Sequence, residues 1–163
     1  MTVVSMTGTR TRRTTQSGHA MIELVFSAAV MMSCLAGTFQ FGYTFYAYNQ
    51  LVSAVGNGGR YAATRTYRAA TPDDVEKGRT AIRNMVVFGD PRPAPDAAPV
   101  LPNLTPAQVE VKWTQDPSGA PEAVDVGING YTVNAVFGAM KLTGRPAVEF
   151  PYVGRYAPTE REP

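Results

Sequence analysis

The sequence predicts an α+β protein with a long N-terminal transmembrane helix, a second amphipathic helix and a small antiparallel sheet of three or four strands. Three observations predict this class. An apolar run with one charge follows a basic N-terminus, and a helix start signal with helical apolar spacing lies in the middle of the chain. Apolar and polar residues alternate in the C-terminal third, as in half-buried strands. The 163 residues are enough for one modest domain beside the membrane helix.

The N-terminal region has the charge pattern of a membrane-inserted segment. Residues 1–18 contain three arginines and no acidic residue, and we interpret them as a disordered basic leader. Residues 21–39 follow, with Glu23 as their only charged residue. Because about 20 apolar residues cross a bilayer, we expect a transmembrane segment at about 21–43. A secretory signal peptide fits less well, since the run exceeds the roughly 7–15 residues of a typical signal core and no small-x-small cleavage site follows it.

The helical pattern is expected to continue beyond the membrane, as one long helix over residues 19–68. Aromatic residues between positions 41 and 46 lie where an interfacial belt would be. Gly56, Gly58 and Gly59 come next. We expect these glycines to bend or loosen the helix, because each costs roughly 1 kcal/mol relative to alanine.

A second helix is predicted over residues 71–89. A threonine, a proline and two aspartates begin at Thr71, which supplies an N-cap, a first-turn proline and acids that complement the helix dipole. Gly89 is a natural stop. Residues 90–106 contain six prolines, so we expect an extended linker there rather than a helix or a central strand.

Residues 107–156 are expected to form the antiparallel β region, and residues 157–163 a disordered tail. Asn129-Gly130 predicts a two-residue hairpin turn in which Ile128 opposes Tyr131. Directly opposed residues point to the same face, so this register would put six apolar residues on one side of the sheet. These are Val124, Val126, Ile128, Tyr131, Val133 and Ala135. Pro151 marks the last expected strand as an edge strand.

The composition argues against several function classes. A formal net charge of +2 does not suggest nucleic-acid binding. Cys34 is the single cysteine and lies in the apolar run, so we expect a small buried hydrophobe and no disulfide. One histidine and no carboxylate cluster leave little material for a metal site, and we expect no cofactor. The paired aspartates are explained by the helix start, and the glycines at 56–59 lack the lysine of a phosphate loop. We therefore expect no catalytic residues and no enzyme.

Two stretches of the sequence carry a family resemblance. Gly18 and Glu23 stand five residues apart in RRTTQSGHAMIELVFSAAV, and the second stretch is FQFGYTFYAYNQLVSAVGNGGRYAATRTY. Together they resemble the TadE-like family of the tight-adherence (Tad) pilus system. A glycine–tyrosine pair after the membrane run and an Arg-Tyr-Ala motif at residues 60–62 belong to the resemblance. Two features depart from the family: Leu24 stands where an aromatic residue is frequent, and the apolar run has no proline.

The resemblance implies a pilin-like fold and a structural role. The chain would be a membrane-anchored minor pilin or pseudopilin that takes part in assembling a Tad-type pilus or secretion apparatus, with cell adhesion as the wider process. A prepilin peptidase would cut between Gly18 and His19. The implied partners are the lipid bilayer, that peptidase, other pilin or pseudopilin subunits and Tad assembly proteins, without nucleic acid. The implied location is the bacterial inner membrane, single-pass, with a cytoplasmic N-terminus and a periplasmic or extracellular C-terminal domain.

Glu23 is the candidate assembly residue. A carboxylate at the centre of a span costs about 2.5–3.5 kcal/mol, and less near the interface, so such residues usually have a partner. After the cut, the new α-amine of His19 and the Glu23 carboxylate would be four residues apart at a helix start. The carboxylate could then neutralise this amine or that of an adjacent subunit. The simpler interpretation is an interfacial glutamate whose carboxylate reaches the headgroups.

A second function class stays open. The chain could be a signal-anchored extracytoplasmic binding module that is never processed or polymerised. This alternative predicts that Glu23→Ala is tolerated, whereas the pilin interpretation predicts lost assembly with normal membrane insertion. Trp113 and the tyrosines are expected to serve core packing and interfacial anchoring rather than contacts with a partner.

Overall fold

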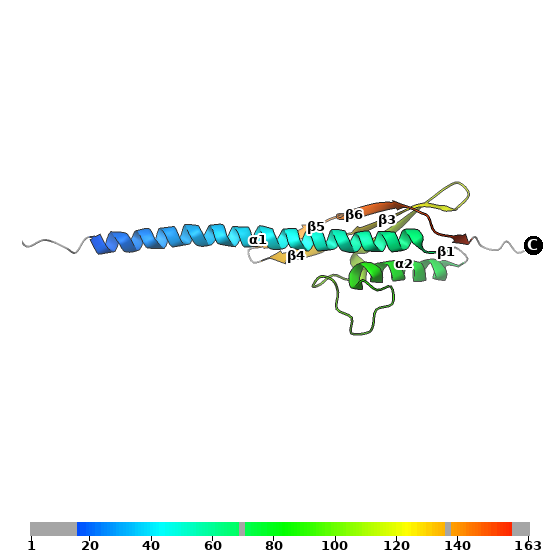
Figure 1. Ribbon diagram of the computed structural model, residues 1–163, viewed down its shortest axis with the longest axis horizontal. Coiled ribbons are helices and arrows are strands. Elements are labelled where there is room, and N and C mark those ends of the chain that lie inside the picture. The colour runs from blue at the N-terminus through cyan, green and yellow to red at the C-terminus, as the bar shows by residue number, and fades with distance from the viewer. Residues whose placement is uncertain (1–15, 69–70, 136–137, 158–163) are drawn as a thin grey trace, which may run out of the picture. The chain divides into compact units, whose positions relative to one another are not determined.

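The computed structural model describes residues 16–68, 71–135 and 138–157 (Figure 1). Most of the expected leader (residues 1–15) and most of the expected tail (residues 158–163) lie outside the described residues. The chain divides into two units, Met1–Phe39 and Gln40–Pro163. The predicted α+β class is confirmed, with a long N-terminal apolar helix, a second helix, and antiparallel sheets of three and two strands.

The described elements follow one another in a simple order. Helix α1 (Gln16–Thr64) comes first, then strand β1 (Tyr67–Arg68), helix α2 (Pro72–Phe88) and the short 3₁₀ helix η1 (Pro106–Gln108). The remaining strands are β2 (Val109–Gln115), β3 (Pro121–Ile128), β4 (Tyr131–Ala135), β5 (Gly138–Leu142), β6 (Ala147–Pro151) and β7 (Tyr156–Ala157). Helix α1 therefore ends before residue 68, and the last two residues of the expected helix form β1, which pairs in parallel with β7.

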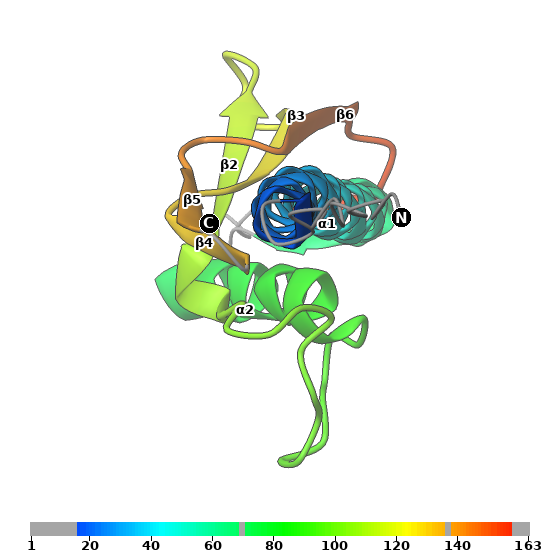
Figure 2. The same cartoon turned by 90° about the vertical axis from the view of Figure 1, so that its left-hand side faces the viewer.

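The second unit is built around the later part of α1. Figure 2 shows this part of the helix with α2 on one side and strands β2, β3 and β6 on the other. The residues that α1 buries recur at helical spacing, which defines one face of the helix. They are Ala47, Leu51, Ala54, Val55, Ala62 and Ala63, each at most 5% exposed.

The expectation that glycines bend α1 is wrong. The helix runs without interruption through residues 56–59 to Thr64. Two of the glycines instead allow close approach: a β-carbon at Gly58 would overlap Val86 of α2, and one at Gly59 would lie 2.6 Å from Cδ2 of Phe150 in β6. Packing against α2 and β6 offsets the helix propensity that the glycines lack.

Helix α2 has both predicted ends. The Thr71 side chain accepts a hydrogen bond from the Asp74 N–H at 3.2 Å, which satisfies one of the free donors of the first turn. Gly89 adopts a left-handed conformation with φ of 73°, and its N–H donates to the Met85 carbonyl at 3.0 Å. The helix presents Ile82, Val86 and Val87 to the core.

The predicted hairpin between residues 128 and 131 is wrong. Strand β3 pairs with β2 and β6 in a three-stranded antiparallel sheet of order β2-β3-β6, and β4 pairs with β5 in a separate two-stranded sheet. The Asn129 N–H donates to the Gln108 carbonyl at 2.8 Å, and the Gly130 N–H donates to the Leu142 carbonyl at 2.9 Å. These bonds belong to different ladders, so Asn129-Gly130 carries the chain from one sheet to the other.

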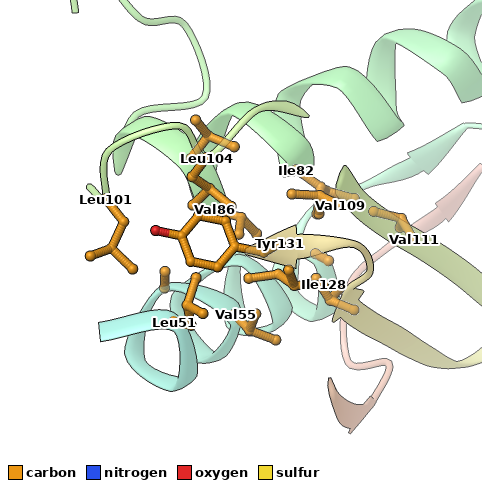
Figure 3. Packing of buried hydrophobic residues seen from close by; sticks show 14 of the residues in the cluster. Leu51, Val55, Ile82, Val86, Leu101, Leu104, Val109, Val111, Ile128 and Tyr131 are labelled. Carbon is orange, nitrogen blue, oxygen red and sulfur yellow. The ribbon is translucent and has the colours of Figure 1, made fainter. Parts of the chain in front are cut away.

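The alternation that suggested the hairpin nevertheless identified core residues. Val124, Val126, Ile128, Tyr131 and Val133 are each at most 4% exposed. Apolar side chains from α1, α2 and the strands meet around Tyr131 (Figure 3). The predicted edge position of the strand that contains Pro151 is confirmed, because β6 lies at one edge of its sheet.

The proline-rich linker is attached to this core. Leu101 and Leu104 are 2% and 3% exposed and belong to the same apolar cluster as Tyr131. The Tyr131 hydroxyl donates a hydrogen bond to the Pro102 carbonyl at 3.0 Å. Burial of this hydroxyl raises the Tyr131 pKa above its ordinary value. The linker thus contributes side chains to the core although it contains neither a regular helix nor a strand before η1.

The segment after β6 closes the domain over the end of α1. The Tyr152 hydroxyl accepts from the Tyr67 N–H at 2.8 Å and lies 2.7 Å from the Arg65 and Arg155 carbonyl oxygens, to one of which it donates. The Val153 N–H donates to the Ala63 carbonyl at 3.0 Å. These bonds satisfy backbone groups that the end of a helix leaves free.

Candidate functional site

The first unit presents an apolar helical surface that no other part of the described chain covers. Between residues 18 and 39, ten large apolar side chains of α1 are 58–71% exposed. They are Met21, Ile22, Leu24, Val25, Phe26, Val30, Met31, Met32, Leu35 and Phe39. A helix that is apolar on all sides suits a lipid environment or the interior of an assembly. By length and composition the helix is able to cross a membrane.

The polar side chains within this apolar segment bond to their own helix. The Ser33 hydroxyl donates to the Ala29 carbonyl at 2.8 Å, and the Thr38 hydroxyl donates to the Cys34 carbonyl at 3.0 Å. Because no water solvates a hydroxyl inside a bilayer, such bonds to the backbone lower the cost of burying it there. Cys34 is a free and exposed thiol.

The three predicted site residues lie at the start of α1. Gly18, His19 and Glu23 are all exposed, and a β-carbon at Gly18 would have no atom within 4 Å. His19 and Glu23 are four positions apart, so they share a face of the helix. Gly18 belongs to the first turn, whose N–H groups lack partners within the helix, and this turn opens more easily than the interior. Among the described residues, the ion pairs join residues 73–83 or 110–112 and do not include Glu23.

Four residues around one cavity of the second unit make packing contacts with one another or with the backbone. A cavity of about 410 Å³ is lined by Tyr61, Tyr67 and Trp113 together with Arg65. The Arg65 guanidinium donates to the Gly78 carbonyl at 3.1 Å and lies 5.5 Å from the centre of the Tyr61 ring. The ring centres of Tyr67 and Trp113 are 4.9 Å apart. These contacts agree with the expectation that the aromatic residues pack.

Among the charged side chains of the second unit, the shifted pKa values arise from local surface contacts. The hydrogen bond and charge of Asp73 raise the pKa of Lys77. Hydrogen bonds from Asn129 and Lys112 lower the pKa of Glu110. In the part of the chain that the structure describes, no group of three or more histidine, cysteine, aspartate or glutamate side chains is placed to hold a metal ion.

Sequence reasoning missed one apolar feature beside the start of the second unit. A groove of about 300 Å³ lies between α1 and the β4–β5 hairpin. Its lining residues are Phe41, Thr44, Phe45, Tyr48, Val133, Met140 and Leu142. The aromatic residues of α1 were visible in the sequence as a candidate interfacial belt. The hairpin could not be placed beside them, because the strand pairing was predicted incorrectly.

Comparison with known families gives one match. Residues 18–60 match the model of a family described as TadE-like protein, which confirms the resemblance. The matched segment is about a quarter of the chain. It contains the whole exposed apolar segment and the first buried turns of α1. Comparison with curated proteins and with solved structures gives no match.

Proposed function

We propose that this chain, which carries a TadE-like segment over residues 18–60, is a membrane-anchored minor pilin or pseudopilin that takes part in assembling a Tad-type pilus or secretion apparatus. A TadE-like segment suggests a pilin-like protein associated with a Tad pilus, and the apolar helix suggests membrane anchoring. The observation that carries the proposal is the uncovered apolar surface of residues 18–39. Glu23 is the only acidic residue in this segment, which contains no lysine or arginine. A surface of this kind serves insertion and helix packing rather than chemistry.

The proposed maturation step is a cut by a prepilin peptidase between Gly18 and His19. Three arginines precede the site and the apolar helix follows it, so the bond lies at the boundary between cytoplasm and membrane. The open space around Gly18 and its place in the first helical turn favour access to the backbone. Residues 19–163 would remain, without the charges that hold the N-terminus in the cytoplasm.

The proposed role of Glu23 follows from the new N-terminus. The cut gives His19 an α-ammonium group, which would compete with solvent and lipid headgroups for the Glu23 carboxylate one turn away. At an effective dielectric constant near 20, two opposite charges 4 Å apart attract by about 4 kcal/mol, which is enough to select a neighbouring subunit that brings its amine to this carboxylate. Packing the apolar helix against other helices would then replace its contacts with lipid.

The proposed location is the bacterial inner membrane. The arginines of residues 1–18 favour a cytoplasmic N-terminus, so the single span would place the second unit in the periplasm or outside the cell. In a fibre, the same helix would be withdrawn from the bilayer and buried among other subunits.

The decisive experiment is N-terminal sequencing and intact mass spectrometry of the protein from cells with and without an active prepilin peptidase. We expect His19 as the first residue only when the peptidase is active. Gly18→Leu should block the cut, whereas Gly37→Leu, at another helical glycine whose β-carbon position is open, should leave it unchanged. An intact N-terminus in cells with an active peptidase would contradict the maturation step.

A second experiment separates the pilin proposal from an unprocessed binding module. Glu23→Gln removes the charge but keeps the shape of the side chain, and Ser27→Ala changes a polar residue one turn later as a matched control. We expect Glu23→Gln to insert into the membrane and mature normally but to lose assembly, measured by cross-linking to neighbouring subunits and by pilus counts. Assembly that survives Glu23→Gln would favour the binding module.

A further inference from the structure

The apolar groove beside α1 is open and lacks charged groups. Its floor includes Val133, which is 2% exposed, while Phe41, Phe45 and Met140 at its rim are 77%, 68% and 52% exposed. The Thr44 hydroxyl in its wall donates to the Gln40 carbonyl at 2.9 Å and so presents no free donor to an occupant. Apart from the Tyr48 hydroxyl, the rest of the lining is apolar, so the groove suits an apolar occupant.

The end of the β4–β5 hairpin lies beside the first residue of the second unit. The Gln40 side-chain amide approaches the Gly138 carbonyl of β5 at 3.5 Å. Ala135 pairs with Gly138, and Val133 pairs with Met140 two positions further along the ladder. The groove thus begins at the level of residues 40–41 of α1.

The length of the apolar segment determines how deep residues 40–43 of α1 lie in a bilayer. At a rise of 1.5 Å per residue, residues 24–39 extend about 24 Å, whereas the hydrocarbon layer is about 30 Å thick. About four more residues, 40–43, are needed to complete the span. No charged side chain occurs between residues 24 and 59, so no charge in this part of α1 opposes the burial of residues 40–43 in the acyl layer. Gln40 then lies about three residues, or about 4–5 Å, inside the acyl layer, so the hairpin end beside it crosses the boundary between acyl chains and headgroups.

We infer that the β4–β5 hairpin is a second membrane contact, and that the groove between it and α1 holds a lipid acyl chain at the surface of the bilayer. The inference rests on membrane anchoring by residues 21–43 and does not depend on the cut after Gly18. Phe41, Phe45 and Met140 supply the apolar rim of the groove. Lys141 is exposed on β5 and points to the opposite face of the strand from Met140, where it meets headgroup phosphates.

Lipid fits the groove better than a water-filled state or a charged peptide. The transfer of exposed phenylalanine and methionine side chains beside a span from water to the interfacial layer is favourable. Tyr43 and Tyr46, on the same stretch of α1, are of the type enriched at that layer. The second unit is consequently held at the bilayer by two contacts, the helix and the hairpin.

The test uses the full chain in vesicles of phosphatidylcholine and phosphatidylglycerol, with an environment-sensitive fluorophore on one cysteine. Three labelled proteins are compared: the natural chain at Cys34, Met140→Cys with Cys34→Ser, and Val153→Cys with Cys34→Ser. Val153 is 71% exposed and hydrogen-bonded to Ala63, far along α1 from Gln40, so it is the matched exposed control. Fluorescence of Trp113 verifies that the second unit is folded in each protein.

We expect nitroxide groups near the headgroups to quench the label at position 140 at least about twofold more than the label at position 153, because only the former lies in the interfacial layer. Deep nitroxide groups should quench the label at Cys34. Equal, weak quenching at 140 and 153 with strong quenching at Cys34 would overturn the inference and leave the membrane anchor intact. Emission at 140 that changes with the protein-to-lipid ratio, without lipid quenching, would assign the groove to a second copy and would also overturn it. An unquenched Cys34 would refute the anchor and the inference together.

Discussion

Helix α1 contains two apolar halves that differ in what covers them. In residues 18–39 the large apolar side chains are exposed on every side, whereas between residues 47 and 63 six apolar side chains face one direction and are almost fully buried, and Val52 is the large apolar side chain that stays exposed. Charge is not what separates them, because no charged residue lies between Glu23 and Arg60, but the second half contains polar residues such as Asn49, Gln50 and Asn57. The difference lies in residue size and periodicity: large residues surround the first half, and alanine and glycine alternate with a few larger residues in the second.

This comparison shows how a single helix can serve two environments. Small side chains in the second half allow α2 and the strands to approach the helix, so protein covers it. The first half has bulky residues all round, and no helix or strand among the described residues covers it. Its surface is therefore available to lipid or to other subunits.

The largest expected effect comes from equal truncations in the two halves. Leu51→Ala removes a side chain that is fully buried and should lower the free energy of unfolding of the second unit by about 2–5 kcal/mol. Leu35→Ala truncates a side chain that is 61% exposed, and it should change the free energy of unfolding of the second unit by less than about 0.5 kcal/mol. Urea unfolding of the full chain in detergent micelles, followed by Trp113 fluorescence, measures both. Similar losses for the two variants would remove the distinction between the halves.

A second pair of substitutions tests close approach within the buried half. Gly58→Ala adds a methyl group that overlaps Val86, and overpacking of this kind should cost about 1–3 kcal/mol, offset in part by better helix propensity. Gly56→Ala has open space and should stabilise the helix by up to about 1 kcal/mol. Opposite signs in the same unfolding assay would support the role of Gly58 in packing. If both variants were stabilised, the contact with α2 would be looser than the structure shows.

The smallest expected effect concerns the Tyr152 hydroxyl, which bonds backbone groups near the C-terminal end of α1. Tyr152→Phe removes a hydrogen bond to the Arg65 or Arg155 carbonyl and one of the two acceptors of the Tyr67 N–H, whose bond to the Arg155 carbonyl remains, and should cost about 1 kcal/mol near neutral pH. Tyr46→Phe is the control, because its hydroxyl is exposed and bonds only the Gln50 amide among the contacts of the described residues.

The effect of Tyr152→Phe should depend on pH in a defined direction. Burial raises the pKa of Tyr152 above its ordinary value near 10, against smaller opposing effects of the Tyr67 N–H and Arg65. The stabilisation is therefore complete below about pH 10 and is lost as the pH rises through the raised pKa, because the unfolded chain ionises first. Unfolding measured at pH 8 and pH 10.5 should show the difference between wild type and Tyr152→Phe shrinking at the higher pH. A difference that grows would contradict the burial of this hydroxyl.

Local signals predicted the helices well because they act over a few residues. Thr71 caps the start of α2 and Gly89 caps its end, each through hydrogen bonds with neighbouring backbone groups. These bonds depend little on the rest of the chain. The basic-to-apolar transition likewise predicted a helix start near His19 and Glu23, although the helix begins at Gln16 and includes Gly18, which the sequence had assigned to the leader. Their use by a peptidase and a neighbouring subunit is determined by molecules outside this chain, which local sequence patterns do not describe.

Long-range pairing was less predictable. An Asn-Gly pair between two alternating segments favours a tight hairpin, but here Gln108 and Leu142 offer competing backbone acceptors that draw Asn129 and Gly130 into different sheets. The glycines of α1 were misjudged for the same reason. Their cost to an isolated helix is local, while their benefit depends on Val86 and Phe150, which are distant in sequence. The groove beside the hairpin could not be found without that pairing.

The adjacent positions of Gly58 and Gly59 also have a mechanical consequence. Gly58 is in close contact with α2 and Gly59 with β6. The helix is therefore packed from two directions about 100° apart around its axis. A pull along α1 would load both contacts in shear, together rather than one after another, and rotation of the helix would be blocked by the same side chains. Tension applied to the N-terminal end of such a helix would therefore move the second unit as one body.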